Sequence, residues 1–256
     1  MASAAGPIVA LSTAGASGPA LFDRFVTAVV RRQLAEWLPA QPATLLDLSL
    51  DCPYLLGPMV DRGHTVVHAD ARRRRLDIVP QPERDAGRLL SVRADPRLLD
   101  WVRSESVDGV VAEGAVLSQS LAAEVAVEEM HRVLRPGGRV LVSVDSLVAG
   151  LSRLADQGRW AELADVPAAD VVLIPGEGDA VSRCFWPEEL DEMLAGCGFV
   201  VEWIRPRTVL AEETVTQALT LDPSRMSSLV RTELALAARR EGESVGPGLI
   251  ASARKR

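Results

Sequence analysis

Short apolar segments alternate with amphipathic segments along most of this chain of 256 residues, and this alternation limits its fold more than any other feature. Strands that alternate with helices pair in parallel, because each helix carries the chain back across the sheet. The pattern therefore predicts an α/β fold whose mostly parallel sheet has helices on both faces. Apolar runs with the length of buried strands lie at residues 44–49, 65–68, 89–92, 109–112 and 139–144, and helical periodicity is clearest at residues 121–133.

The two ends of the chain differ in character. Residues 1–19 are rich in Ala, Gly and Ser and are predicted to form a disordered tail. Apolar residues then recur at three- and four-residue spacing up to Pro39, which predicts a first helix within residues 20–38. We expect residues 20–256 to form one domain that ends with helices at 188–194 and 224–239 and strands at 199–204 and 248–253.

Composition excludes several classes of function. The formal net charge of −7 argues against nucleic acid as a partner, because phosphate binding needs a basic face. No apolar run has the length of a membrane span, and the first residues lack the basic start of a secretory signal, so a cytoplasmic location is expected. Cys52, Cys184 and Cys197 have no paired spacing and no nearby histidines, so neither a metal site nor a disulfide is predicted.

The strongest motif lies after the midpoint of the sequence. Residues 130–143 read MHRVLRPGGRVLVS, which is typical of a helix, a Pro-Gly-Gly turn and a buried strand. Residues 107–112 read VDGVVA before it, and FWPEEL and AGCGF follow at 185–190 and 195–199. In order and spacing these segments resemble class I S-adenosylmethionine-dependent methyltransferases. The resemblance covers residues 21–254 and implies a Rossmann-like, seven-stranded sheet with an antiparallel last strand, and S-adenosyl-L-methionine as cofactor.

The loop that would hold the cofactor departs from this family. Its usual pattern is an acidic residue, an apolar one and then Gly-x-Gly-x-Gly, and here Asp47 matches the acid while Ser49, Asp51 and Pro53 replace the glycines. Retained positive φ angles would cost about 1–2 kcal/mol per replaced glycine, so the loop is expected to take another path. Asp51 would also repel the cofactor's carboxylate. Pro58 is expected to be the first residue of a helix that starts one turn late.

The resemblance assigns roles to three more acidic residues. Asp70, after the second strand, would accept hydrogen bonds from the ribose, although an aspartate there is also a common helix cap. Asp95 would meet the adenine, although it also suits a turn before Pro96. Glu113 follows the fourth strand, where open α/β sheets place ligands, and is the candidate catalytic acid or base.

Two functions follow, and the sequence leaves both open. One is a methyltransferase that acts on a small molecule, which the acidic residues at 47, 70 and 95 favour. The other is a catalytically inactive relative that serves as a binding, regulatory or assembly subunit, which the missing glycines favour. A third class, an NADP-dependent oxidoreductase using the arginines at 72–75, would still need the missing glycine fingerprint, so a solvated face or a partner patch fits that cluster better.

The family also suggests where a substrate would bind. Its acceptor pockets are built from the N-terminal helix and from insertions, here residues 147–183, which are predicted to be a lid or substrate insertion. The first helix and residues 147–170 could supply a homodimer face or a surface for a protein partner, the alternative being a monomer. Tyr54, the one tyrosine, would either cover the cofactor or pack against the first helix.

Overall fold

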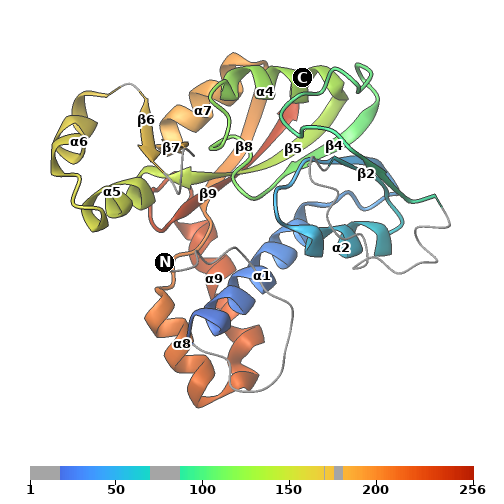
Figure 1. Ribbon diagram of the computed structural model, residues 1–256. Helices are drawn as coiled ribbons and strands as arrows, with labels where there is room; N and C mark the ends of the chain where they lie inside the picture. Colours follow the sequence, from blue (N-terminus) through green and yellow to red (C-terminus); the bar gives the residue numbers. More distant parts are fainter. Residues whose placement is uncertain (1–17, 70–86, 170, 176–180) are drawn as a thin grey trace.

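A computed structural model describes residues 18–69, 87–169, 171–175 and 181–256 (Figure 1). Five parallel strands form its centre, and the chain then adds two further strands, of which only β9 (Gly248–Lys255) runs against the direction of the central strands. β9 pairs antiparallel with β5, and β8 (Phe199–Pro206) pairs antiparallel with β9. The parallel strands run in the order β3 (Leu89–Val92), β2 (Thr65–Ala69), β1 (Thr44–Asp47), β4 (Val107–Ala112) and β5 (Leu134–Ser146).

These seven strands confirm the predicted Rossmann-like fold class, but the described part of the sheet has nine. The two additional strands, β6 (Val172–Pro175) and β7 (Val181–Phe185), form an antiparallel hairpin. β7 extends the sheet at the carboxyl end of β5, where Asp145 and Ser146 pair with Cys184 and Phe185. The sequence indicated β6 only as a short apolar run and gave no sign of β7.

Both faces of the central strands β1 and β4 are buried, as their continuous apolar sequences predict. On one face, Leu46 and Val110 pack with α4 (Ala123–Val133) and α7 (Pro187–Gly196). On the other face, their neighbours Leu45 and Val111 pack with α1 (Gly18–Trp37) and α2 (Leu56–Asp61). Because side chains alternate along a strand, each central strand feeds two separate cores and its carboxyl end stays held between two helical layers.

Several predicted boundaries move, among them the starts of two helices and of β5, which begins at Leu134 instead of residue 139. α1 begins at Gly18, so the last two residues of the predicted tail belong to this helix, and residues 1–17 lie outside the described part. α2 begins at Leu56 after a 3₁₀ turn at Pro53–Leu55, so the expected start at Pro58 is two residues late. Pro58 is tolerated because it lies in the first turn, where backbone N–H groups have no helical partner to lose.

The segment predicted as a lid folds as a separate arm. It contains α5 (Leu147–Asp156), α6 (Trp160–Asp165) and the β6–β7 hairpin, and it projects from the end of β5 on the side away from α2 (Figure 1). Its small core is built from Leu147, Leu154, Val172, Ile174 and Cys184. A role as a lid stays a prediction.

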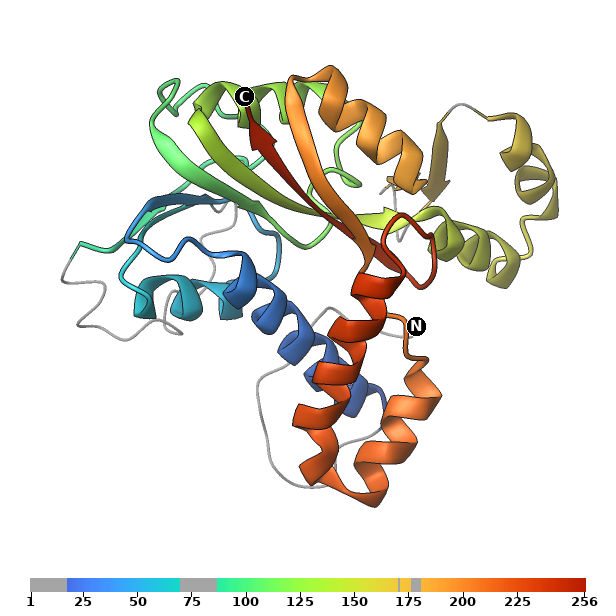
Figure 2. The same cartoon turned by 180° about the vertical axis from the view of Figure 1, so that it is seen from behind.

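A second helical unit lies between β8 and β9 in the sequence. α8 (Glu212–Leu221) and α9 (Met226–Arg239) pack against α1 below the sheet (Figure 2), with Phe25, Val215 and Val230 in their shared core. The helical pattern predicted α9 but not α8.

Glu233 of α9 ties this unit to the sheet. The side chain is fully buried, and its two carboxylate oxygens accept hydrogen bonds from the backbone N–H groups of Val209 and Leu210 at 2.7 and 2.9 Å. Burial raises the pKa of this carboxyl above its ordinary value. Glu233 therefore fixes the segment that leaves β8.

Replacing Glu233 should destabilise the fold through this segment. We expect Glu233→Ala to lower the free energy of unfolding by about 1–3 kcal/mol, since two partly buried N–H groups lose their acceptor. Urea denaturation measures the change, and Glu192→Ala, at an exposed position of α7, serves as the control. Equal stabilities of the two variants would contradict this role.

Candidate functional site

The loops that follow β1 and β4 are joined to each other. The N–H of Leu48 donates to the carbonyl of Val111 at 2.8 Å, and the N–H of Leu50 donates to that of Glu113 at 2.9 Å. Gly114 has φ +77°, and a Cβ there would lie 2.0 Å from the carbonyl oxygen of Leu50. Only glycine fits this contact, so the two loops meet at the carboxyl edge of the sheet, where open α/β sheets bind ligands.

Two predicted cofactor residues, Asp47 and Ser49, come together inside this junction. One oxygen of the buried Asp47 carboxylate accepts from the Ser49 hydroxyl at 2.6 Å and from its N–H at 3.3 Å. The other lies 2.8 Å from Nδ1 of His68 on β2. The Ser49 hydroxyl oxygen in turn accepts from the N–H of Glu113 at 3.1 Å. Asp47 therefore organises the loop from within.

The backbone of the loop keeps one feature of a glycine-rich turn. Asp51 has φ +56°, in the left-handed region, whereas Ser49 and Pro53 do not have positive φ. Aspartate is among the non-glycine residues that tolerate this conformation best, because its short side chain can hydrogen-bond locally. The predicted change of path thus concerns the positions of Ser49 and Pro53. The third glycine position is occupied by Asp51, a residue type that tolerates a positive φ.

Glu113 lies directly after β4 and is 3% exposed. One of its carboxylate oxygens, Oε2, accepts a short hydrogen bond from the guanidinium of Arg207, which also donates to the amide oxygen of Gln33 on α1. The other oxygen, Oε1, is buried and has no hydrogen-bond partner among the described residues. Glu113 thus takes part in a buried ion pair and retains one open acceptor.

Sequence reasoning missed Arg207 and Gln33. Arg207 follows the last residue of β8, and no pattern around it distinguishes it from the partly exposed Arg205 two positions earlier. Its partners lie 174 and 94 positions away in the sequence. The topology of the sheet alone brings them together.

Cys52 and Tyr54 form the buried end of the loop after β1. The Tyr54 hydroxyl donates to Sγ of Cys52 at 3.5 Å, and the ring packs against the core that α1 shares with β1. Burial raises the pKa of the Cys52 thiol to about 12 and also raises the pKa of the Tyr54 phenol. Of the two roles expected for Tyr54, the structure displays the packing role.

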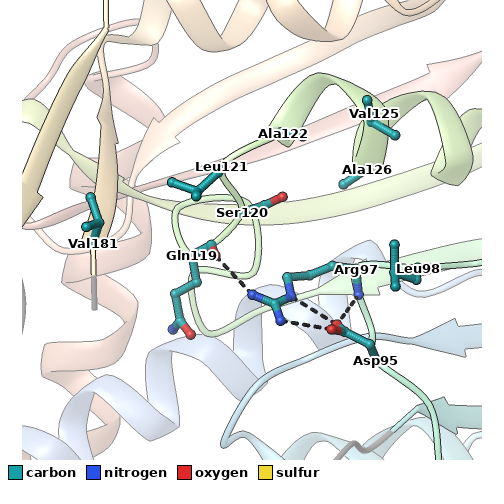
Figure 3. A pocket seen from close by; sticks show the side chains of 10 residues that line it. All are labelled: Asp95, Arg97, Leu98, Gln119, Ser120, Leu121, Ala122, Val125, Ala126 and Val181. Carbon is teal, nitrogen blue, oxygen red and sulfur yellow. Dashed lines mark hydrogen bonds and ion pairs between the residues drawn. The ribbon is translucent and has the colours of Figure 1, made fainter. Parts of the chain in front are cut away.

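Asp95 lies apart from these residues. Its carboxylate is bound bidentately by the guanidinium of Arg97 at 2.9 and 2.8 Å and also accepts from the Arg97 N–H at 2.9 Å (Figure 3). Arg97 holds the pKa of this carboxyl below its ordinary value. Both residues line an open pocket of about 490 Å³ together with Leu98, Leu121 and Val125, and neither Asp47 nor Glu113 contributes to it. The turn role suggested for Asp95 is therefore present in the structure.

The remaining site residues lie outside the described part of the chain. These are Asp70 and the arginines at 72–75, whose expected roles stay predictions. Within the described ranges, no group of three or more His, Cys, Asp or Glu side chains could hold a metal ion. None of the described helices combines the length and the apolar character needed to cross a membrane.

Comparison with known proteins agrees with the fold. Residues 53–142 match the model of the methyltransferase domain family. No curated protein matches the chain.

Solved structures match over most of the chain at low identity. The 1,6-didemethyltoxoflavin-N1-methyltransferase of Burkholderia thailandensis, solved with bound 1,6-didemethyltoxoflavin and S-adenosylhomocysteine, is 18% identical over 95% of this chain and 93% of its own, with a TM-score of 0.53. An S-adenosylmethionine-dependent methyltransferase from Mesorhizobium loti is 16% identical over 90% and 100%, with a TM-score of 0.56. Another, from Methanosarcina mazei, is 15% identical over 87% and 96%, with a TM-score of 0.53.

The strand order and these neighbours define the fold of the protein. The chain has the class I fold seen in these S-adenosylmethionine-dependent methyltransferases, and its residues 53–142 match the methyltransferase domain family. The loop that lacks glycine follows the first strand of this fold, where the resemblance predicts the cofactor loop.

The contact between the loops can be tested with a matched pair of glycines. Gly114 and Gly137 both have φ +77°, but a Cβ at Gly137 would meet nothing within 4 Å. We expect Gly137→Ala to cost about 1–2 kcal/mol of stability from the backbone alone. Gly114→Ala should cost about 1–3 kcal/mol more, because the new methyl group collides with Leu50. Thermal and urea denaturation provide both values, and equal losses would refute the close contact.

The three cysteines should differ in reactivity. A thiol reacts as the thiolate, so at pH 8 Cys52, with a pKa of about 12, and Cys184, with a pKa of about 11, should be modified slowly. The less buried Cys197 should react first with an aromatic disulfide reagent. In denaturant the three thiols should be modified at similar rates. In the folded protein, Cys52→Ser should remove one of the slow phases of modification. A fast phase that disappears with Cys52→Ser would be inconsistent with a closed loop.

Proposed function

We propose that this protein is an S-adenosylmethionine-dependent methyltransferase that acts on a small molecule. The observation that carries the proposal is the loop after β1, which keeps a left-handed turn at Asp51 and joins the β4 loop through Gly114. A retired site would not need these two constraints, since a loop free of function could relax the strained φ angle. The net charge of −7 supports a small molecule over a nucleic acid.

The residues present suit the cofactor in kind, except that the Asp51 carboxylate would have to turn away from the cofactor's own carboxylate. The left-handed turn and the glycine contact form a tight backbone cradle of the sort that a ligand can approach closely. The turn from Ser49 to Pro53 would hold the methionine part, Asp70 the ribose and Asp95 the adenine, and Asp95 would have to exchange its bond with Arg97. When bound, S-adenosylmethionine supplies an electrophilic methyl group. The chain's own task is then to hold the acceptor in line with it.

Glu113 is the residue we assign to the acceptor. Its Oε1 atom is a buried acceptor without a partner among the described residues, at the end of the strand where this fold binds substrates. A carboxylate oxygen in that position can accept a hydrogen bond, and then the proton, from a hydroxyl or amine. Arg207 holds the other oxygen and so orients the group.

The alternative is a protein of the same fold that no longer catalyses and binds a partner instead. One observation favours it: the carboxylates of Asp47 and Asp95 are both engaged by the protein's own donors. The function would then be to bind a second copy of the chain or a protein partner through the first helix and residues 147–170. Cofactor binding separates the two proposals.

Calorimetric titration with S-adenosylmethionine and S-adenosylhomocysteine tests the proposed function. We expect dissociation constants in the micromolar range, on the order of −8 kcal/mol. Asp70→Ala should weaken binding of both ligands, since the ribose loses its acceptor, while Asp61→Ala, an exposed position on α2, should leave it unchanged. Absence of binding at millimolar ligand would reject the enzyme and favour the non-catalytic alternative.

A further inference from the structure

We propose that Arg207, Gln33 and Glu113 form an acceptor subsite for a small carboxylate that also carries a hydroxyl or amine next to its acid group. The assignment of this ligand as the methyl acceptor rests on the proposed function. Its binding depends only on these three side chains.

Three separate elements bring the subsite together. Gln33 comes from α1, Glu113 from the end of β4, and Arg207 from the end of β8. The side chains of Arg207 and Glu113 are 10% and 4% exposed. An ion pair this deeply buried is not needed for stability, because apolar residues of similar volume serve a fold equally well or better. Its place at the carboxyl edge of the sheet suits binding instead.

The chemistry of the three side chains defines the ligand. The guanidinium makes hydrogen bonds to one neutral amide and one carboxylate among the described residues, which leaves further N–H donors in a planar fork. Such a fork matches the two oxygens of a carboxylate. Oε1 of Glu113, in contrast, needs a ligand group that donates a hydrogen bond. A buried carboxylate oxygen without such a donor costs free energy. A molecule with an acid group beside a hydroxyl or amine satisfies both.

The subsite is held in position before any ligand arrives. The N–H of Arg207 donates to the carbonyl of Gly248 at 2.8 Å. The carboxylate of Glu233 binds the N–H groups of Val209 and Leu210, which follow shortly after Arg207 in the chain. Gly246 has φ +83°, and a Cβ there would lie 2.0 Å from the carbonyl oxygen of Thr208. A guanidinium on so constrained a backbone loses little freedom on binding.

Three aromatic probes test the ligand class: salicylate has the acid and the hydroxyl, benzoate only the acid, and phenol only the hydroxyl. Titrations are run on the protein with and without S-adenosylhomocysteine. We expect salicylate to bind at least about tenfold more tightly than phenol, with benzoate between them, because charge-assisted hydrogen bonds are the stronger ones. Equal affinity for salicylate and phenol would overturn the proposal.

The variants are chosen so that folding is preserved. Arg207→Met alone would leave a buried, unpaired carboxylate, so the double variant Arg207→Met/Glu113→Gln removes both charges together. It should lose the tenfold preference for salicylate. The matched control is Arg205→Met, which removes a partly exposed arginine of β8 that pairs with Glu241, and this variant should keep the preference. A preference that survives in the double variant would also overturn the proposal.

The cofactor titration keeps this test separate from the proposed function. Binding of S-adenosylhomocysteine without any preference for salicylate would overturn the subsite and leave the methyltransferase. A preference for salicylate that depends on Arg207, in a protein that does not bind S-adenosylhomocysteine, would support the subsite and reject the methyltransferase.

Discussion

The contact between the Leu50 carbonyl and Gly114 is the constraint on which the rest of the site depends. It joins the loops after β1 and β4, and the hydrogen bonds from Asp47 through Ser49 to Glu113 run across the same junction. Because both strands are held between two cores, the junction cannot move without disturbing the centre of the sheet. The position of Glu113, and with it the ion pair to Arg207, follows from this arrangement.

Three family glycines are replaced in the loop after β1, but only one of the three positions has a backbone conformation that favours glycine. Glycine is needed only where φ is positive or where another group approaches closely. In this loop only one of the three positions, Asp51, retains a positive φ, and the close approach is made by a glycine on the neighbouring loop. In this chain the close approach that requires glycine is thus made from the β4 loop, which motif matching along the β1 loop does not detect.

The sequence predicted the central architecture well because its signals are local. Residues 89–92 form β3 as expected, and the helix before the Pro-Gly-Gly turn differs by two residues at its start. β7 was missed because Val181–Phe185 contains Ser and Arg and has no regular alternation. Glu233 carried a signal that was overlooked: it lies on the apolar stripe of α9, between Val230 and Ala237, where a charged residue is unexpected.

The candidate site was predictable in part, for a physical reason. Asp47, Ser49 and Glu113 follow neighbouring strands, so the sheet topology places them together as expected. Arg207 and Gln33 reach the site through side chains from distant elements, and only the packing of α1 and the end of β8 over the sheet joins them. Asp95 was placed by family resemblance, which does not foresee that the neighbouring Arg97 engages its carboxylate.

A crystal structure of the protein grown with S-adenosylhomocysteine tests the central claim most directly, namely that the loop without glycines still forms a cofactor site. We expect the ligand at the carboxyl edge of β1 and β4, with its homocysteine part against the turn at Asp51 and Gly114. A ligand bound elsewhere on the fold, or an empty edge in crystals grown at saturating ligand, would contradict it.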